Sequence, residues 1–276
     1  MSSPSGPTPA NWYPDPTGRH QLRYFDGAQW TEHVSSNGVQ STDPLQPGPV
    51  PVATQSAEKT QRQLERAGVT AGAVQGGGTI FSEPVLVVNQ KAKLIEINNE
   101  YSICDQHGRQ IGAIRQVGQT ALKKAVRVLT SLDQFMTHSL QIVDMNGAVL
   151  LTITRPAKLL KSKFSIGDAH GNVIGEIVQK NAIGKIRFGL VAGGQEVGSL
   201  NAENWRAWNF AVLDASGVEV ARITKTWEGL AKTMFTTADN YVVQIHRPLD
   251  DPLRSLVVAS ALSVDTALKQ DSRGLG

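Results

Sequence analysis

The chain reads Ile103-Cys-Asp-Gln-His-Gly-Arg-Gln-Ile111 at the first of four places where Asp-x-x-Gly separates two apolar runs. An Asp carboxylate can accept hydrogen bonds from backbone amides that follow it, and Gly adopts a positive φ without a Cβ clash. The Val and Ile residues on either side suit pleated strands, so each copy predicts a β-hairpin. The four anchor pairs are Asp105/Gly108, Asp144/Gly147, Asp168/Gly171 and Asp214/Gly217.

The hairpins recur at a regular interval. Asp168 follows Asp144 by 24 residues, and Asp214 follows Asp168 by 46 residues, which is two steps of 23. A degenerate copy at 190–197 (Leu-Val-Ala-Gly-Gly-Gln-Glu-Val) lies near the midpoint of the longer interval. A hairpin at every such step predicts an antiparallel sheet that closes or folds on itself.

Composition narrows the class of protein. The 276 residues, of which 40% are hydrophobic, suffice for one large β domain with additions. A single cysteine, Cys104, excludes an internal disulfide framework and fits a reducing cytoplasm. The formal charge of +3 is too small to indicate nucleic acid. Local clusters of Lys and Arg are either solvated faces or contacts to anionic lipid head groups.

One apolar stretch, at 255–264, is a candidate helix near the end of the sequence. As a helix it reaches roughly 15 Å, against ~30 Å of membrane hydrocarbon. It is therefore predicted to be a buried core helix that begins at Asp251-Pro252, where Asp250 or Asp251 caps the free amides. The first ten residues lack the apolar core of a secretory signal.

Residues 11–34 are dense in aromatic side chains and contain the hairpin turn Asp26-Gly27. We expect two or three small strands that hold Trp12, Tyr24 and Trp30 in one mini-core. The stretch resembles a short actinobacterial domain of unknown function with the patterns Trp-Tyr-x-Asp-Pro and Arg-Tyr-Trp-Asp-Gly-x-x-Trp-Thr. The aromatic residues either form only this core or make a docking surface for a partner protein, with Trp12, Tyr13, Tyr24 and Trp30 as the candidates.

Residues 35–79 are rich in Ser, Pro, Gly, Gln and Thr, which is typical of a flexible linker, with a short helical piece possible at 58–66. A main domain is expected over 80–270. Within it, 85–88 and 94–97 are predicted strands, whereas the apolar spacing at 121–129 fits either a helix or a strand.

The C-terminal part carries a specific resemblance. Four segments follow one another in a fixed order: Lys225-Thr-Trp-Glu-Gly229, Phe235-Thr-Thr-Ala-Asp-Asn-Tyr241, Gln244-Ile-His-Arg-Pro-Leu-Asp250 and Ser263-Val-Asp265. With the hairpins upstream, residues 80–268 resemble the phospholipid scramblase family of the Tubby-like superfamily. The resemblance implies a mainly β fold, a closed antiparallel barrel of about twelve strands around a hydrophobic C-terminal helix. The helix residues that would fill the lumen are Leu253, Leu256, Val257, Val258, Leu262 and Val264.

The resemblance also implies a candidate calcium loop. The family is credited with calcium-dependent movement of phospholipids between leaflets, through an Asp-x-Asp-Asn-x-Gly run that matches 237–242 here. Thr237 and Val242 replace the first Asp and the Gly, which leaves only Asp239 and Asn240. Calcium takes about six to eight oxygen ligands, so tight binding is not expected and a β-turn is favoured. We therefore expect no cofactor.

Two functional hypotheses remain. The first is a scramblase-like, cytoplasmic protein that lies peripherally at the inner face of the plasma membrane, binds anionic phospholipid and assists lipid redistribution. Its candidate lipid contacts are Lys158, Lys161, Lys163, Trp205 and Trp208. The second is a non-enzymatic structural module that docks proteins without lipid activity. No Gly-x-Ser-x-Gly, Walker or dinucleotide motif is present, so neither hypothesis includes an enzyme.

Overall fold

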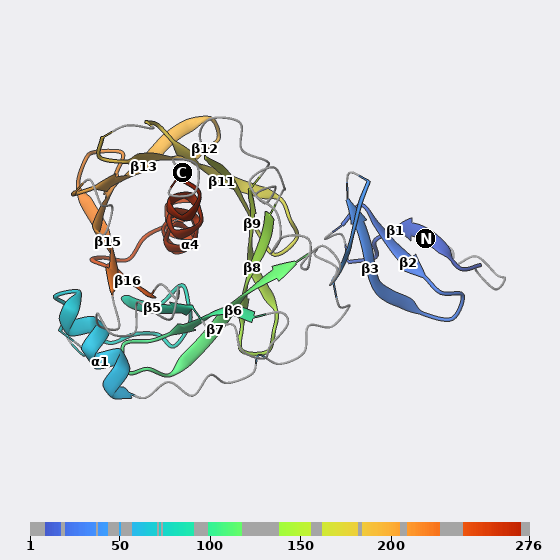
Figure 1. Cartoon of the computed structure of the whole chain (residues 1–276), viewed down its shortest axis with the longest axis horizontal. Coiled ribbons are helices and arrows are strands. Elements are labelled where there is room, and N and C mark those ends of the chain that lie inside the picture. The colour runs from blue at the N-terminus through green and yellow to red at the C-terminus, as the bar shows by residue number, and fades with distance from the viewer. Residues whose placement is uncertain are drawn as a thin grey trace.

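The computed structural model describes residues 9–17, 20–36, 38–43, 50, 57–70, 72, 74–90, 99–117, 138–155, 162–181, 184–204, 209–226 and 240–271. Two bodies are visible, a large barrel and a small sheet that lies apart from it (Figure 1). The predicted helix or strand at 121–129 and the predicted strand at 94–97 lie outside the described residues.

Twelve antiparallel strands form the closed barrel (Figure 1). Eleven ladders join neighbours along the chain, and β16 pairs with β5 to close the ring. This confirms the predicted mainly β fold. The strands are β5 (Val85–Gln90), β6 (Asn99–Cys104), β7 (Gln110–Val117), β8 (His138–Asp144), β9 (Val149–Arg155), β10 (Lys163–Gly167), β11 (Val173–Gln179), β12 (Arg187–Ala192), β13 (Gln195–Ala202), β14 (Asn209–Asp214), β15 (Glu219–Thr226) and β16 (Asn240–Ile245).

The Asp-x-x-Gly turns have the geometry that their sequence predicts. In the first copy, Asp105 Oδ1 accepts hydrogen bonds from the amides of His107 and Arg109, each at 2.9 Å. Gly108 has a φ of 81°, and the glycines of the other three turns lie between 83° and 85°. The degenerate copy forms a fifth hairpin, in which Ala192 faces Gln195 across a turn of two glycines.

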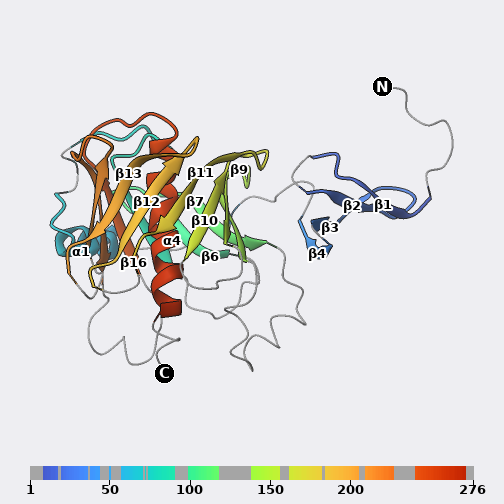
Figure 2. The same cartoon turned by 90° about the horizontal axis from the view of Figure 1, so that it is seen from above.

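Strand direction sorts the connections into two groups. Because successive strands alternate in direction, all five hairpin turns lie at one end of the barrel, which we call the turn end. The connections after β5, β7, β9, β11, β13 and β15 reach the opposite end, which we call the loop end. Figure 2 shows the two ends on opposite sides of the barrel.

Helix α4 (Leu253–Asp271) enters at the turn end and runs through the lumen toward the loop end (Figures 1 and 2). Asp251 caps it, since Asp251 Oδ1 accepts the amide of Ser255 at 3.1 Å and its hydroxyl at 2.6 Å. Leu256, Val257 and Val258 are buried as predicted, and Leu253 packs against the same core. The side chains of Leu262 and Val264 lie outside the described part.

Two strand glycines make room for this helix. A Cβ on Gly175 would lie 3.2 Å from the Leu256 side chain, and one on Gly198 would lie 3.1 Å from Leu253. The lumen is therefore filled by large helix side chains that pack against bare strand backbone. Among the described residues, no helix combines the length and the hydropathy that a membrane crossing requires.

Parts of the segment 35–79, which was predicted to be a flexible linker, make ordered contacts. Helix α1 (Ala57–Arg66) packs Leu64 against Val85 and Val87 on the outer wall of the barrel. Its Gln63 Nε2 donates to Asn89 Oδ1 at 2.6 Å. Val50 is buried against β7 to β9, and its amide donates to the Met145 carbonyl at 3.0 Å. Helix α1 agrees with the helical piece expected at 58–66, whereas the contacts of Leu64 and Val50 depend on single buried side chains that average composition does not reveal.

The small sheet has four strands in sequential order, rather than two or three. They are β1 (Asn11–Pro14), β2 (Leu22–Phe25), β3 (Trp30–Ser36) and β4 (Val39–Thr42). The sheet thus extends past residue 34, where the aromatic unit was expected to end, because β3 continues to Ser36 and pairs with β4.

The packing of α4 yields a first prediction. Gly175→Ala should destabilise the barrel by about 1–3 kcal/mol, because the new Cβ overpacks the core. It would lie 2.5 Å from the Val191 carbonyl oxygen as well as against Leu256. Urea unfolding measures the change. Val173→Ala on the same strand is the control, since Val173 is 67% exposed. Equal midpoints for the two variants would contradict the close packing of α4 on β11.

Candidate functional site

Lys163 is the candidate lipid contact that the described residues include, and it lies at the loop end. Lys163 is the first residue of β10, exposed, with its Nζ 2.8 Å from Glu176 Oε1 on β11. Lys158 and Lys161 lie outside the described residues, in the connection from β9 to β10. Trp205 and Trp208 also lie outside them, in the connection from β13 to β14. The topology brings these two connections to the same end, but four strands apart around the barrel.

The two ends of the barrel differ in charge. The loop-end segments hold eleven Lys or Arg residues against five Asp or Glu residues: 91–98, 118–137, 156–162, 180–186, 203–208 and 227–239. The turn-end segments hold six Asp residues against two Arg residues: 105–109, 144–148, 168–172, 193–194, 214–218 and 246–252. The hairpin aspartates that build the turns therefore also make the turn end acidic, whereas the sequences that connect strands at the opposite end are rich in basic residues.

Tryptophan follows the same division. The barrel part of the chain contains three tryptophans, Trp205, Trp208 and Trp227, and all three belong to loop-end connections. Tryptophan and basic side chains together are typical of segments that lie at a membrane interface. The sequence placed Lys158, Lys161, Lys163, Trp205 and Trp208 in one set of candidate contacts, and the strand order adds that their connections share an end.

Some basic residues on the outer wall are already paired. Glu196 Oε2 lies 2.9 Å from Lys180 Nζ, and its Oε1 lies 3.0 Å from Arg187. The hydrogen bond from Lys180 and the charges of both cations lower the pKa of Glu196 below its usual value. Lys163 is likewise paired with Glu176. These pairs reduce the charge that the two lysines and Arg187 offer to a ligand.

Of the two candidate calcium ligands, Asn240 belongs to the described structure. Asp239 lies outside it, and Asn240 is the buried first residue of β16, paired with Thr226 and Asn89 on the two neighbouring strands. Asn240 is thus a strand residue rather than part of the expected β-turn. Among the described residues, no group of three or more His, Cys, Asp or Glu side chains could hold a metal ion.

The aromatic residues of the small sheet form two clusters instead of one mini-core. Trp12 and Tyr24 meet edge to face with ring centroids 5.4 Å apart. Trp30 instead contacts Phe25 at 5.3 Å and Tyr13 at 6.1 Å. Adjacent residues of a strand point to opposite faces, so the two clusters lie on opposite faces of the sheet. All five rings are half-buried.

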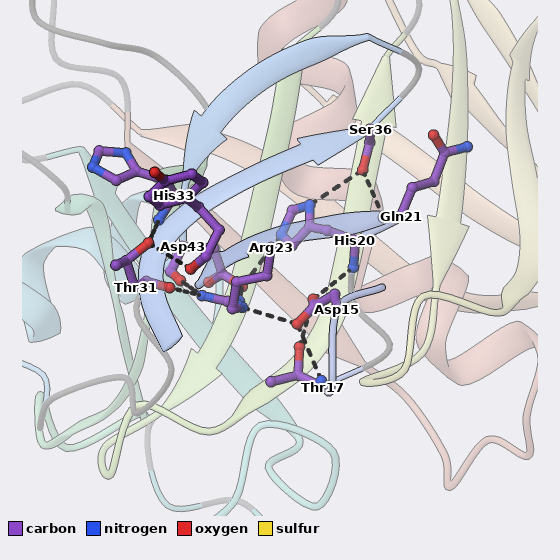
Figure 3. Close-up of polar contacts among 10 residues, drawn as sticks. Asp15, Thr17, His20, Gln21, Arg23, Thr31, His33, Ser36 and Asp43 are labelled. Atoms are coloured by element: carbon purple, nitrogen blue, oxygen red, sulfur yellow. Dashed lines mark hydrogen bonds and ion pairs between the residues drawn. The ribbon is translucent and has the colours of Figure 1, made fainter. Parts of the chain in front are cut away.

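The centre of the small sheet is an arginine that the sequence did not reveal (Figure 3). Arg23 is 0% exposed, and its Nε donates to Asp15 Oδ1 at 2.8 Å. Its second amino group lies 3.1 Å from Asp43 Oδ2, and the first donates to the Thr31 carbonyl at 2.9 Å. His20 Nε2 lies 3.2 Å from the same Asp43 oxygen. These bonds join β2, β3 and the segments that flank the sheet.

The carboxylate of Asp15 is held ionised by this network. Burial acts to raise its pKa, but hydrogen bonds from Arg23 and Thr17 outweigh burial and lower the pKa from 3.8 to about 2.

The pKa of the Cys104 thiol in the barrel is shifted upward instead, because burial raises it to about 11. A thiol with such a pKa is protonated at neutral pH and is not a nucleophile.

Arg23 provides a prediction on stability. Arg23→Met should unfold the small sheet, because two buried aspartates would lose their cation at a cost of about 3–5 kcal/mol. Proton–nitrogen correlation spectra would show this as loss of the dispersed indole signals of Trp12 and Trp30, while the barrel signals persist. His33→Ala, at an exposed position of β3, should leave all indole signals in place. Retained signals in Arg23→Met would exclude the network as the support of the sheet.

The pKa of Asp15 provides a prediction on pH. Its folded pKa lies below the ordinary value, so the stabilisation is present above pH 3.8 and is lost as the pH falls toward 2. The loss amounts to about 2 kcal/mol. The Trp12 and Trp30 indole signals should therefore collapse within this window. In Asp15→Asn, which cannot titrate, the same window should show a weaker dependence. An equal dependence in both proteins would contradict this assignment.

Comparison with known proteins agrees with the architecture. The Scramblase family matches residues 69–268, and a family described as a protein of unknown function (DUF2510) matches residues 10–50. A curated relative is the altered inheritance rate of mitochondria protein 25 of Saccharomyces cerevisiae, 23% identical over 197 residues. The alignment covers 60% of this chain and 59% of the yeast protein.

A solved structure is also similar to this chain. The X-ray structure of an Arabidopsis thaliana protein covers 68% of the chain and 99% of its own length, with 13% identity and a TM-score of 0.39. An overlap of this size carries no information on function. The match to the Scramblase family carries more information, because it spans the whole barrel, from the residues that follow α1 into helix α4. The chain belongs to the Scramblase family.

Proposed function

We propose that the loop end of the barrel binds the head groups of anionic phospholipids and holds the protein at the inner face of the plasma membrane. The observation that carries the proposal is the difference in composition between the two groups of connections. The loop-end connections contain more basic than acidic residues and all three tryptophans of the barrel part of the chain. An acidic turn end would orient the molecule, because an anionic surface repels it. The membership of the Scramblase family supports a lipid ligand.

A few basic residues are enough to give measurable affinity for an anionic membrane. A Lys or Arg side chain close to an anionic membrane contributes about 1 kcal/mol, so a few free cations suffice for peripheral binding. Lys158 and Lys161 are the contacts we assign first, with Trp205 and Trp208 at the interface. Lys163 contributes less, because Glu176 already pairs with it. Calcium has no part in this proposal.

Charge reversal tests the orientation. The double variant Lys158→Glu/Lys161→Glu should weaken co-sedimentation with anionic vesicles by at least about 30-fold. The matched control is Arg109→Glu/Arg247→Glu, which changes the net charge equally at the turn end, where both side chains are more than half exposed. The control should bind as the unchanged protein does. Equal weakening by both would mean that net charge, not the loop end, decides binding.

Lipid movement is the second part of the proposal. The bound protein would assist phospholipid redistribution between leaflets, which can be followed as chemical quenching of fluorescent lipids that reach the outer leaflet. Loss of redistribution in Lys158→Glu/Lys161→Glu, with activity retained in the turn-end control, is the expected result. Binding without redistribution in the unchanged protein would restrict the function to lipid binding. Absence of binding to every vesicle would favour a protein-docking module instead.

A further inference from the structure

The small sheet presents three aromatic rings on one face. Tyr13, Phe25 and Trp30 lie edge to face, with centroids 5.3 to 6.5 Å apart. We call these three residues the ring cluster. Each ring is half-buried, so a substantial part of its surface faces solvent. The cluster belongs to the part of the chain outside the Scramblase match, and the proposed lipid site does not use it.

The buried Arg23 network lies beside the ring cluster, on the same face of the sheet. Tyr13 lies opposite Arg23 across the β1–β2 ladder. Thr31, next to Trp30, binds the Arg23 guanidinium through its carbonyl and donates its hydroxyl to the Tyr24 carbonyl at 2.9 Å. Rings that are held in place before a ligand arrives lose little entropy on binding. The cluster is thus a preformed surface.

The spacing of the rings and the hydrogen bond of Tyr13 limit the classes of ligand that the cluster can bind. A cage that holds a cation between ring faces keeps its rings apart, whereas these rings touch one another, so a ligand must lie over them. The Tyr13 hydroxyl already donates to the carbonyl of Pro9 at 3.0 Å. The carbonyls of a polyproline II helix have no internal partner, and its prolyl rings pack on aromatic side chains. The contact to Pro9 shows that chemistry within the chain.

Charge separates a peptide ligand from a membrane. Residues 9–43 carry four acidic and two basic side chains, and Arg23 is fully engaged with Asp15 and Asp43. Asp26 is exposed at the turn between Phe25 and Trp30, and hydrogen bonds from the Gln29 and Ala28 amides lower its pKa, so it is ionised at neutral pH. An acidic surface repels an anionic bilayer and attracts a basic peptide.

We propose that the ring cluster is a docking surface for an extended proline-rich segment, flanked by basic residues, of another protein. Nine of the 13 prolines of this chain lie within its first 51 residues, around the sheet.

The test is a titration of the full-length protein into a fluorescein-labelled peptide with Pro at every third position and two arginines at one end. The readout is fluorescence anisotropy. Trp30→Ala should abolish binding, whereas Tyr13→Phe, which keeps the ring and removes only the hydrogen bond to the Pro9 carbonyl, should leave binding nearly unchanged. Trp12→Ala is the matched control, because Trp12 lies on the opposite face of the same sheet. The control should bind with unchanged affinity.

The indole signals of Trp12 and Trp30 report whether each variant keeps the sheet folded, and Tyr13→Phe provides a variant whose ring packing is preserved. Equal binding of a peptide with alanine in place of proline would overturn the proposal. So would loss of binding in Trp12→Ala but not in Trp30→Ala. A dimer that dissociates in Trp30→Ala, without peptide binding, would identify a second copy as the occupant and overturn the assigned partner. Binding of vesicles that depends on Trp30, without peptide binding, would also overturn the assigned partner and would identify a membrane as the ligand.

Discussion

The ladder between β5 and β16 is the constraint on which the barrel depends. It joins Leu86 to Val243, residues far apart in the chain, and turns an open sheet into a ring without exposed edges. Closure creates an interior, and the interior determines which strand faces are apolar. Without this pair, the buried side chains of eleven other ladders would face a lumen open along one side.

Closure by antiparallel neighbours also separates the two ends of the molecule. Tight turns accumulate at one end because every second connection along the chain is a hairpin. In four of the five turns an Asp carboxylate accepts backbone amides, and the fifth is a Gly-Gly turn. The opposite end receives the longer connections, which carry the lysines and tryptophans. A structural requirement for turns thus produces a charge difference along the barrel axis, and a peripheral membrane protein can use such a difference for orientation.

Features that depend on neighbouring residues were predictable from sequence, and those that depend on distant pairs were not. Asp105 and Gly108 define their turn within four residues, so the hairpins and the strands around them follow from local chemistry. Arg23 lies in an ordinary strand sequence, and its partner Asp43 follows 20 residues later, beyond the expected end of the aromatic unit. The shared end of the Lys158 and Trp205 segments was equally hidden, because it depends on strand order.

The place of α4 in the lumen has a consequence for how the protein is made. The helix follows β16 in sequence, so all twelve strands leave the ribosome before the segment that fills their interior. During synthesis the inner faces of β9, β10 and β11 lack their partner α4, and such apolar surfaces are prone to aggregation until the helix arrives. Folding must also wait for the β5–β16 pair, whose long sequence separation makes closure slow. The nascent chain therefore passes through an open, hollow sheet that chaperones are suited to bind.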